Sequence, residues 1–338
     1  MRQPPGSHEK EGDVLQQHAI RQRKGNRALT SRVNYSRYGY LFVAPFLIAF
    51  TVFTLYSIIF TVQISFTNLT NWRLDDMSSV GLENFKLLLD PASPVGSGFW
   101  SAFTNTVIIW VVNFVPQLLI ALLLAQWFTD SRLRIRFQGG FKVLIFMPHT
   151  ITAATIAILF YALFTYPIAP VNTLLQQLGF MHQPVQFFRS VPFSRNLISF
   201  LQWWMWYGNT MIVLIAGILG INPDLFEAGL VDGCNSRQMF TKITLPLLKP
   251  IMLYTLVTSM IGGLQMFDIP QLLTQGDPQG ATNTVARFIY RQAFFGSYNF
   301  NYAAAASIIL FFIILVLSML LFYFMRDRSV KIDRRAGK

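Results

Sequence analysis

Six long apolar segments constrain the fold of this chain more than any other feature of its sequence. They lie at about 40–64, 103–127, 143–165, 197–220, 251–273 and 303–325. A helix needs roughly 20 apolar residues to cross a hydrocarbon layer about 30 Å thick, and backbone groups in lipid must pair within their own segment. Membrane β-strands would alternate in polarity, which residues 308–317 do not. The sequence therefore predicts an all-α, polytopic membrane protein with six spans.

The composition supports a membrane protein. Apolar residues make up 53% of the 338 residues and charged residues only 12%, about half the charged share of a soluble domain. The single cysteine, Cys234, excludes an internal disulfide and a metal site with several cysteines. No cleaved signal peptide is expected, because the first 39 residues are polar and longer than a signal n-region. We expect residues 1–39 to form a basic, flexible arm and residues 326–338 a basic tail.

Lys and Arg are distributed unevenly among the segments that connect the spans. If the N-terminal arm is cytoplasmic, 21 of the 27 basic residues lie on the cytoplasmic side and 6 on the opposite side. This bias follows the positive-inside rule and predicts that both termini face the cytoplasm. The net charge of +12 then reflects topology and attraction to anionic lipid, and nucleic-acid binding is not expected.

The cytoplasmic segment at 221–250 is too apolar for a solvated connector. Asn222 suits the N-cap of a helix, and Gly233 suits a left-handed residue that ends it. A second helix can begin near Asn235, and Pro246 would stop or kink it. We predict two short helices joined by a glycine turn. Their small residues favour either docking of another protein or packing of the loop against its own spans, and the pattern alone leaves both open.

Glutamate, alanine and glycine positions in this segment match a family pattern: E-A-A, three residues, G, nine residues, I-x-L-P. The matching region contains Glu227, Ala228, Gly229, Asp232, Gly233, Ile243, Leu245 and Pro246. The chain therefore resembles the binding-protein-dependent ABC importer permeases, whose EAA loop (221–250 here) receives work from an ATPase. Gly229 replaces the usual Ala and would weaken the helix by up to ~1 kcal/mol. Segments 40–46, 81–85 and 267–294 resemble the carbohydrate-uptake branch, in its subunit type with the longer N-terminal arm.

The resemblance implies a permease domain at 40–325 in the cytoplasmic (inner) membrane. Its expected partners are a pair of ATP-binding subunits, a second permease subunit that makes a heterodimer, an extracytoplasmic solute-binding protein and membrane lipid. The solute would be a sugar or a related polyol or glycerol-phosphate compound, moved by alternating access. No G-x-x-x-x-G-K-[ST] sequence occurs. We therefore expect no catalytic residue, cofactor or metal in this chain, and ATP with Mg²⁺ to be hydrolysed by the partner subunits.

Polar residues within spans are candidates for the solute path, because they are costly in lipid and usually face a cavity. They include Asn113, Gln117, His149, Asn209, Gln265 and Asp268. Asp268 can bind sugar hydroxyls, pair with Arg287 or Arg291, or cap local backbone. Trp204, in an aromatic cluster at 203–207, can stack on a sugar face or anchor the span at the membrane surface. His149 is expected to be a buried, hydrogen-bonded histidine, with a proton relay as the alternative.

Two other functions fit a six-span protein. A secondary active transporter of a small polar solute would show inverted repeats and paired charges within its spans. Here Asp268 is the one acid within a span, and no convincing repeat is visible. A membrane-embedded enzyme would need a pattern such as H-E-x-x-H or G-x-S-x-G, and neither occurs.

Overall fold

The structure is a computed structural model that describes residues 36–71, 73, 75, 77–130, 132–133, 135–167, 169–296 and 298–325. Within these residues the regular secondary structure is helical, apart from one isolated antiparallel β-bridge between Thr67 and Ser79. The all-α prediction is therefore confirmed. The predicted tail at 326–338 and most of the predicted arm at 1–39 lie outside the described residues.

The chain divides into two compact units, one ending at Phe60 and the other beginning at Thr61. In the first unit α2 (Ser36–Ala49) runs directly into a π-helical segment, η1 (Phe50–Leu55). The next helix, α3 (Tyr56–Ser65), continues across the boundary. Together Gly39–Ser65 provide 27 helical residues, long and apolar enough to cross a membrane. They lie close to the predicted first span.

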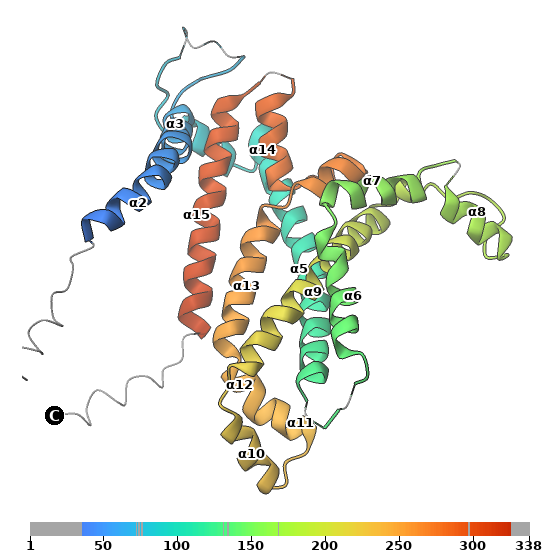
Figure 1. Ribbon diagram of the computed structural model, residues 1–338. Helices are drawn as coiled ribbons and strands as arrows, with labels where there is room; N and C mark the ends of the chain where they lie inside the picture. Colours follow the sequence, from blue (N-terminus) through green and yellow to red (C-terminus); the bar gives the residue numbers. More distant parts are fainter. Residues whose placement is uncertain are drawn as a thin grey trace, which may run out of the picture. The chain divides into compact units, whose positions relative to one another are not determined.

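Four long helices dominate the second unit (Figure 1). They are α5 (Pro94–Thr129), α9 (Val191–Leu219), α13 (Lys249–Leu264) and α15 (Phe300–Met325). Apolar clusters join α5 to α9 at two levels, through Ile109 with Leu201 and through Ala121 with Leu214. A third cluster joins α5 to α13 and α15 around the fully buried Phe99. The helix α5 is thus in direct contact with α9 and α13, and the cluster around Phe99 links it to α15.

Short helices lie at the two ends of this unit (Figure 1). One end carries α4 (Glu83–Leu89) and α14 (Val285–Phe294), while α8 (Pro170–Gln177) and η3 (Phe187–Arg189) belong to a segment that extends to the side of the unit. The opposite end carries α10 (Pro223–Val231), α11 (Ser236–Met239), η4 (Phe240–Thr244) and α12 (Leu245–Leu247). The segment predicted to form the EAA loop therefore lies at the end away from α14.

Hydroxyl caps determine where two of the long helices begin. The Ser93 hydroxyl accepts a hydrogen bond from the Gly96 N–H at 2.9 Å, and Pro94 occupies the first helical position. The Ser190 hydroxyl caps α9 in the same way. As a result α5 begins at Pro94, well before the predicted start at 103, and α9 begins before the predicted start at 197.

The third predicted span, 143–165, is two helices rather than one. The helices α6 (Gln138–Thr150) and α7 (Ala153–Phe164) meet at an angle of 85°. Pro148 stands in the last turn of α6, where it lacks an N–H donor, and the hydroxyl of Thr152 caps the new helix. The apolar run concealed this break because apolar residues continue on both sides of it.

The fifth predicted span, 251–273, also breaks. The helix α13 ends at Leu264, and the π-helical segment η5 (Pro270–Thr274) follows. Pro270 has no N–H for the carbonyl of Met266, and the Thr284 hydroxyl donates to that carbonyl instead, at 2.9 Å. Among the described residues three helices can cross a membrane alone, and three further pairs are bent by more than 40°. Counting each bent pair as one span gives up to six.

Candidate functional site

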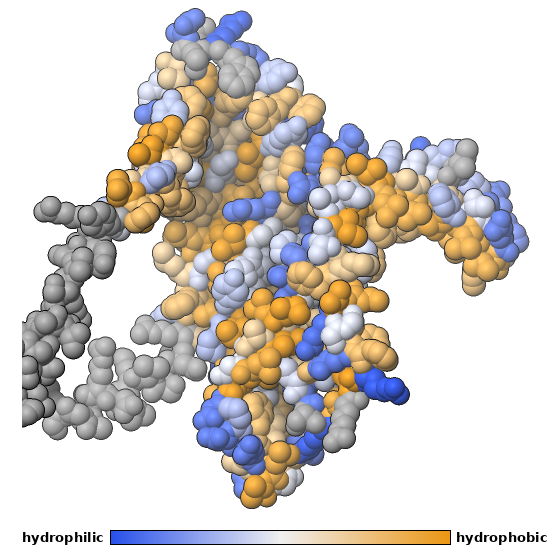
Figure 2. Space-filling view, in the orientation of Figure 1, coloured by the Kyte–Doolittle hydropathy of each residue, from blue (hydrophilic) through white to orange (hydrophobic). Residues whose placement is uncertain are grey.

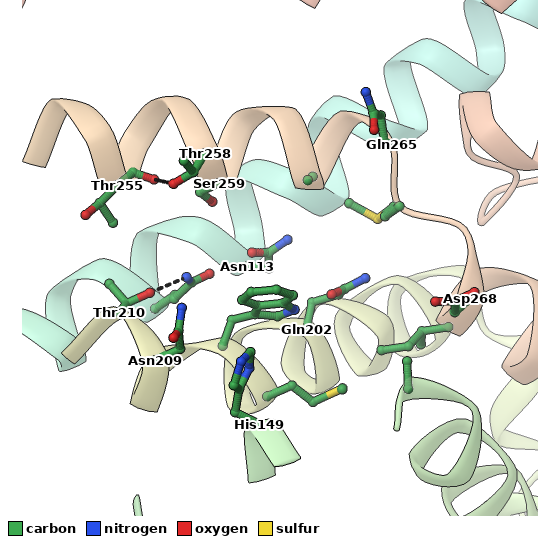
Figure 3. A pocket seen from close by; sticks show the side chains of 18 of the residues that line it. Asn113, His149, Gln202, Asn209, Thr210, Thr255, Thr258, Ser259, Gln265 and Asp268 are labelled. Carbon is green, nitrogen blue, oxygen red and sulfur yellow. Dashed lines mark hydrogen bonds between the residues drawn. The ribbon is translucent and has the colours of Figure 1, made fainter. Parts of the chain in front are cut away.

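A polar cavity of about 540 Å³ opens between α5, α6, α9 and α13. We call it the inner cavity, and residues 265–269, between α13 and η5, form one of its walls. All six polar residues singled out within the spans line it: Asn113, Gln117, His149, Asn209, Gln265 and Asp268. Figure 3 shows side chains from α13 and α9 facing each other across this space. The structure thus gathers the predicted solute-path residues of four segments into one site.

Two helices supply most of the remaining polar lining. Thr255, Thr258 and Ser259 lie on one face of α13, at i, i+3 and i+4. Gln202 and Trp206 extend the row of Asn209 along one face of α9. The cavity therefore lies between two polar stripes on otherwise apolar helices.

The hydroxyls and amides of the cavity differ in whether they have a hydrogen-bond partner within the protein. Gln117 donates to the hydroxyl of Thr210 at 2.8 Å, within the protein. The hydroxyls of Thr255 and Thr258 donate to carbonyls of their own helix. In the described part of the chain the amides of Asn209 and Gln265 have no such partner, although both line the cavity. They are therefore free to hydrogen-bond a polar ligand.

Among the described residues that line the inner cavity, Asp268 is the single carboxylate, and none is Lys or Arg. Its side chain is exposed to the cavity space, as Figure 3 shows. Among the described residues it forms no ion pair with Arg287 or Arg291, which removes one of the alternatives considered from the sequence. A carboxylate that faces such a cavity can accept hydrogen bonds from ligand hydroxyls.

The aromatic cluster divides between the cavity and the apolar core. Trp206 lines the inner cavity, and the His149 ring lies 4.8 Å from it in an edge-to-face arrangement. Trp204 lies outside the cavity lining and stacks on Phe200 at 6.3 Å within an apolar cluster. The two tryptophans are two residues apart, which rotates one side chain by about 200° around the helix from the other and places them on different faces. His149 is half-buried and makes ring contacts rather than the expected hydrogen bond within the described residues.

At the other end of the unit, the first helix of the EAA loop has the predicted boundaries. The Asn222 side chain accepts a hydrogen bond from the N–H of Asp224 at 3.1 Å, and Pro223 takes the first helical position. At its end Gly233 has φ of +76°. The N–H of Cys234 bonds the carbonyl of Gly229, and the N–H of Gly233 bonds that of Leu230. These two bonds form a Schellman motif, which favours glycine at this position.

The second helix is held by a capping box. Asn235 and Gln238 each accept a hydrogen bond from the other's backbone N–H. This helix packs back on α10, where Gly229 is buried. A Cβ at Gly229 would lie 3.0 Å from Met239 and from Ile243, so glycine brings the two short helices together. The predicted pair of short helices with a glycine turn is confirmed.

The opposite face of the EAA loop is open to solvent. Glu227, Ala228, Asp232 and Gly233 are all exposed, and Val231 is 89% exposed. In Figure 2 hydrophobic and hydrophilic residues lie side by side on the surface at this end. Ile243 and Leu245 are half-buried, and Pro246 is exposed. The small-residue face is therefore accessible for docking, while Gly229 serves packing within the loop.

Arg132 ties this loop to the end of α5. It follows Asp130, the C-cap of that helix, and donates from Nη2 to the Cys234 carbonyl at 2.7 Å. Its Nη1 lies 3.5 Å from the Ser236 hydroxyl. A cavity of about 380 Å³ beneath the loop is lined by Arg132 and Glu227, among others. The glycine turn is therefore attached to α5 by a side chain that crosses between two segments.

Within the described ranges, no three His, Cys, Asp or Glu side chains lie together as a metal site would require.

A family model described as "Binding-protein-dependent transport system inner membrane component" matches residues 92–332, which is most of the chain. The chain belongs to this family. It is thus a membrane component of a transport system that works with a binding protein, as the resemblance of the EAA loop predicted.

Individual proteins agree with the family. The chain is 34% identical to a lactose transport system permease from Rhizobium radiobacter, over 89% of this chain and 100% of that protein. It is 33% identical to an arabinooligosaccharide transport system permease from Bacillus subtilis, over 75% of this chain and 77% of that protein. In fold it is similar to a chain of a bacterial ABC transporter involved in alginate import, with a TM-score of 0.73 at 24% identity, covering 89% and 99% of the two chains.

Several residues of this membrane component's sites were missed in the sequence. The stripe of Thr255, Thr258 and Ser259 was visible as an i, i+3, i+4 pattern of hydroxyls, a signal that a polar face runs along the fifth span. Gln202 was signalled by its spacing from Asn209, whereas Trp206 belongs to the aromatic cluster at 203–207 that was already a candidate for stacking on a sugar. Arg132 had no such signal, because its partner is a backbone carbonyl about a hundred positions away in the chain.

Proposed function

We propose that this chain is the membrane-spanning permease subunit of an ATP-driven importer for an uncharged saccharide. The observation that carries the proposal is the inner cavity, which gathers amides, hydroxyls, one carboxylate and Trp206 within the helices. Its volume of about 540 Å³ is within the range of about 300–1,000 Å³ usual for ligand sites. The names of the lactose and arabinooligosaccharide relatives support this substrate class.

The chemistry of the cavity suits sugar hydroxyls. Free amides of Asn209 and Gln265 offer both donors and acceptors, and Asp268 offers strong acceptors. The exposed face of Trp206 offers an apolar surface for the C–H face of a ring. The lack of Lys and Arg in the lining disfavours an anionic solute there.

The EAA loop is the proposed site of energy coupling. Both termini and this loop would face the cytoplasm, as the distribution of Lys and Arg predicts. The exposed face with Glu227, Ala228, Asp232 and Gly233 would dock on a separate ATP-binding subunit. The chain itself would hydrolyse no ATP, since no phosphate-binding loop sequence occurs in it.

The complete importer would contain a pair of ATP-binding subunits, a second and similar permease subunit, and a solute-binding protein on the outer side. Closure of the ATP-binding subunits would move the EAA loop. Through the packed contacts of Arg132 this motion would reach α5, which lines the inner cavity. Rigid-body movement between two packed states would then expose the cavity to each side in turn.

Uptake in proteoliposomes tests the proposal. The full complex is reconstituted with its solute-binding protein, and uptake of labelled lactose and of arabinooligosaccharides is measured with ATP, without ATP, and with an imposed proton or sodium gradient. We expect uptake that requires both ATP and the binding protein. Uptake driven by the ion gradient without ATP would instead identify a secondary transporter and overturn the proposal.

A further inference from the structure

A second cavity, of about 650 Å³, lies at the end of the unit that carries α14. We call it the arginine pocket, because Arg287 and Arg291 of α14 both line it. Its polar lining is completed by side-chain amides: Gln271, Gln275, Asn283 and Gln292. No carboxylate is among the residues that line it. Two of the six basic residues predicted on the outer side of the membrane thus share one cavity.

The two arginines are four residues apart, so they stand on the same face of α14. Arg291 is exposed, and Arg287 is half-buried. Neither guanidinium forms an ion pair with a carboxylate in the described part of the chain. Burial lowers the pKa of Arg287, the neighbouring charge of Arg291 lowers it further, and Asp277 opposes both effects. The pocket therefore keeps a net positive charge, which Asp277 offsets only in part.

The Arg287 side chain is held in place by its neighbours, but one of its hydrogen-bond donors has no partner. Its Nη1 donates to the Asn283 side chain at 2.8 Å, and the guanidinium lies against the backbone at Gly276, where a Cβ would be 2.7 Å from Cζ. Its Nε is buried without a hydrogen-bond partner in the structure. Buried donors of this kind are nearly always paired in complete assemblies. The buried Nε is out of reach of a ligand, but Arg287 lines the pocket together with Arg291, and a guanidinium held in place beside a second one is suited to a planar oxyanion such as a carboxylate.

The transported solute is a poor candidate for this anion. The arginine pocket and the inner cavity are separated by a ring contact between Tyr290, which lines the first, and Phe267, which lines the second, with centroids 4.9 Å apart. Beyond that contact the only charged lining residue is Asp268, a carboxylate. An anionic solute that bound the arginines would meet like charge in the inner cavity, with no cation to neutralise it.

We infer that the arginine pocket is the site where this chain receives an acidic side chain, Asp or Glu, of the solute-binding protein. The inference rests on the proposed function, because it places α14 on the outer side of the membrane. The pocket is next to the Phe267–Tyr290 contact, so an inserted carboxylate would bind beside the wall between the outer surface and the inner cavity. Docking of the loaded binding protein would thus act on the wall that the solute must pass.

Binding of the labelled solute-binding protein to the complete transporter in nanodiscs tests this. Arg287→Gln and Arg291→Gln are each expected to weaken binding about tenfold, because each removes a charge-assisted contact. The double variant should be weaker still and less sensitive to salt. Arg189→Gln is the matched control, since Arg189 is an exposed arginine of the predicted outer side that does not line the pocket. Unchanged affinity in the double variant would refute the inference.

A charge exchange identifies the partner. In Arg291→Glu, binding should be lost and then regained when one acidic residue on the docking face of the solute-binding protein is changed to Lys. Failure of every acidic position to restore binding would overturn the assignment to that protein. Normal membrane yield and normal ATPase activity without binding protein show in each case that the variant is folded and assembled.

Two further measurements test whether the anion in the pocket comes from a source other than the binding protein. Galacturonate is titrated onto the transporter without binding protein, and thermal unfolding is followed. If galacturonate stabilises the wild-type transporter but not the Arg287→Gln/Arg291→Gln variant, an acidic solute occupies the pocket. If the second permease is lost when the double variant is purified, the pocket is a contact between subunits. Either result overturns the inference. If uptake by the wild-type transporter does not increase when the binding protein is added, the proposed function itself fails. This outcome is distinct from failure of the inference about the arginine pocket.

Discussion

The EAA loop and the inner cavity obtain their structure in opposite ways. In the loop, the caps and the turn are formed by bonds between residues within about ten positions: the Asn222 cap, the Schellman motif at Gly233 and the capping box at Asn235. The hydrogen bonds from Arg132 attach this unit to α5 but do not form its helices. The inner cavity is formed by helices that are far apart in the chain, and its polar side chains contact one another in few places. The loop is thus a rigid unit defined locally, whereas the cavity depends on how the helices are placed.

This difference suits two different tasks. A surface that transmits force must keep its shape while the rest of the protein moves, and short-range caps and turns allow this. A cavity that opens to each side in turn must change shape, and weakly connected walls allow that. We therefore expect substitutions in the loop to affect coupling, and substitutions in the cavity to affect the apparent affinity for solute.

The largest effect is expected from Gly233→Trp. The left-handed φ of +76° disfavours any side chain, and the exposed position would place an indole on the proposed docking face. We expect uptake to fall by more than about thirtyfold, equivalent to about 2 kcal/mol, with normal amounts of protein in the membrane. Gly179→Trp is the control, because Gly179 also has φ of +76° with open space around it but lies beyond α8, outside the EAA loop. Normal uptake in Gly233→Trp would show that the loop does not transmit the work.

Asp268→Asn tests whether the inner cavity binds the solute. The change keeps shape but removes the charge that strengthens hydrogen bonds to sugar hydroxyls, so the KM for uptake should rise about tenfold. The ATPase activity without solute should not change. Asp75→Asn, which changes an exposed acid that lines neither the inner cavity nor the arginine pocket, is the matched control. An unaltered KM in Asp268→Asn would exclude the carboxylate from solute binding.

Arg132→Gln weakens the link between the loop and α5. Loss of the charged hydrogen bond to the Cys234 carbonyl is expected to reduce solute moved per ATP hydrolysed by about fivefold, consistent with about 1 kcal/mol. The KM for solute should stay the same, which a general loss of folding would not predict. Arg136→Gln removes an exposed charge from the same connection and serves as control. Equal coupling in both variants would mean that the contact is incidental.

Gly229→Ala should have the smallest effect. Alanine favours the helix by up to about 1 kcal/mol, but its Cβ would press on the flexible ends of Met239 and Ile243 at 3.0 Å. These effects oppose each other, so uptake should change by less than about twofold. Gly229→Leu cannot be accommodated in this contact and should disrupt the loop, seen as faster proteolysis at 230–238. Tolerance of leucine would mean that the two short helices do not pack as described.

The same contrast explains what could be predicted from the sequence. Asn222, Pro223, Gly233 and Asn235 each have a local preference that the chain satisfies, so the helices and turn of the loop could be derived before the structure was known. The apolar runs predicted the spans, but the breaks after Pro148 and before Pro270 depend on caps from Thr152 and Thr284 that hydropathy does not register. The contents of the cavity followed from polarity within spans. That Trp206 rather than Trp204 faces it required the rotation of α9.

The length of α5 gives the Arg132 contact a wider consequence. Its 36 residues make a rod of about 54 Å, and the rod is anchored at both ends. Near one end the amide of Asn105 donates to the carbonyls of Gly280 and Asn283, which flank the arginine pocket, and just beyond the other end Arg132 binds the glycine turn. We expect a tilt imposed at one of these contacts to reach the other through this single helix, whose backbone hydrogen bonding is interrupted at Pro116. In the proposed orientation, one continuous element would then link events on the two faces of the membrane.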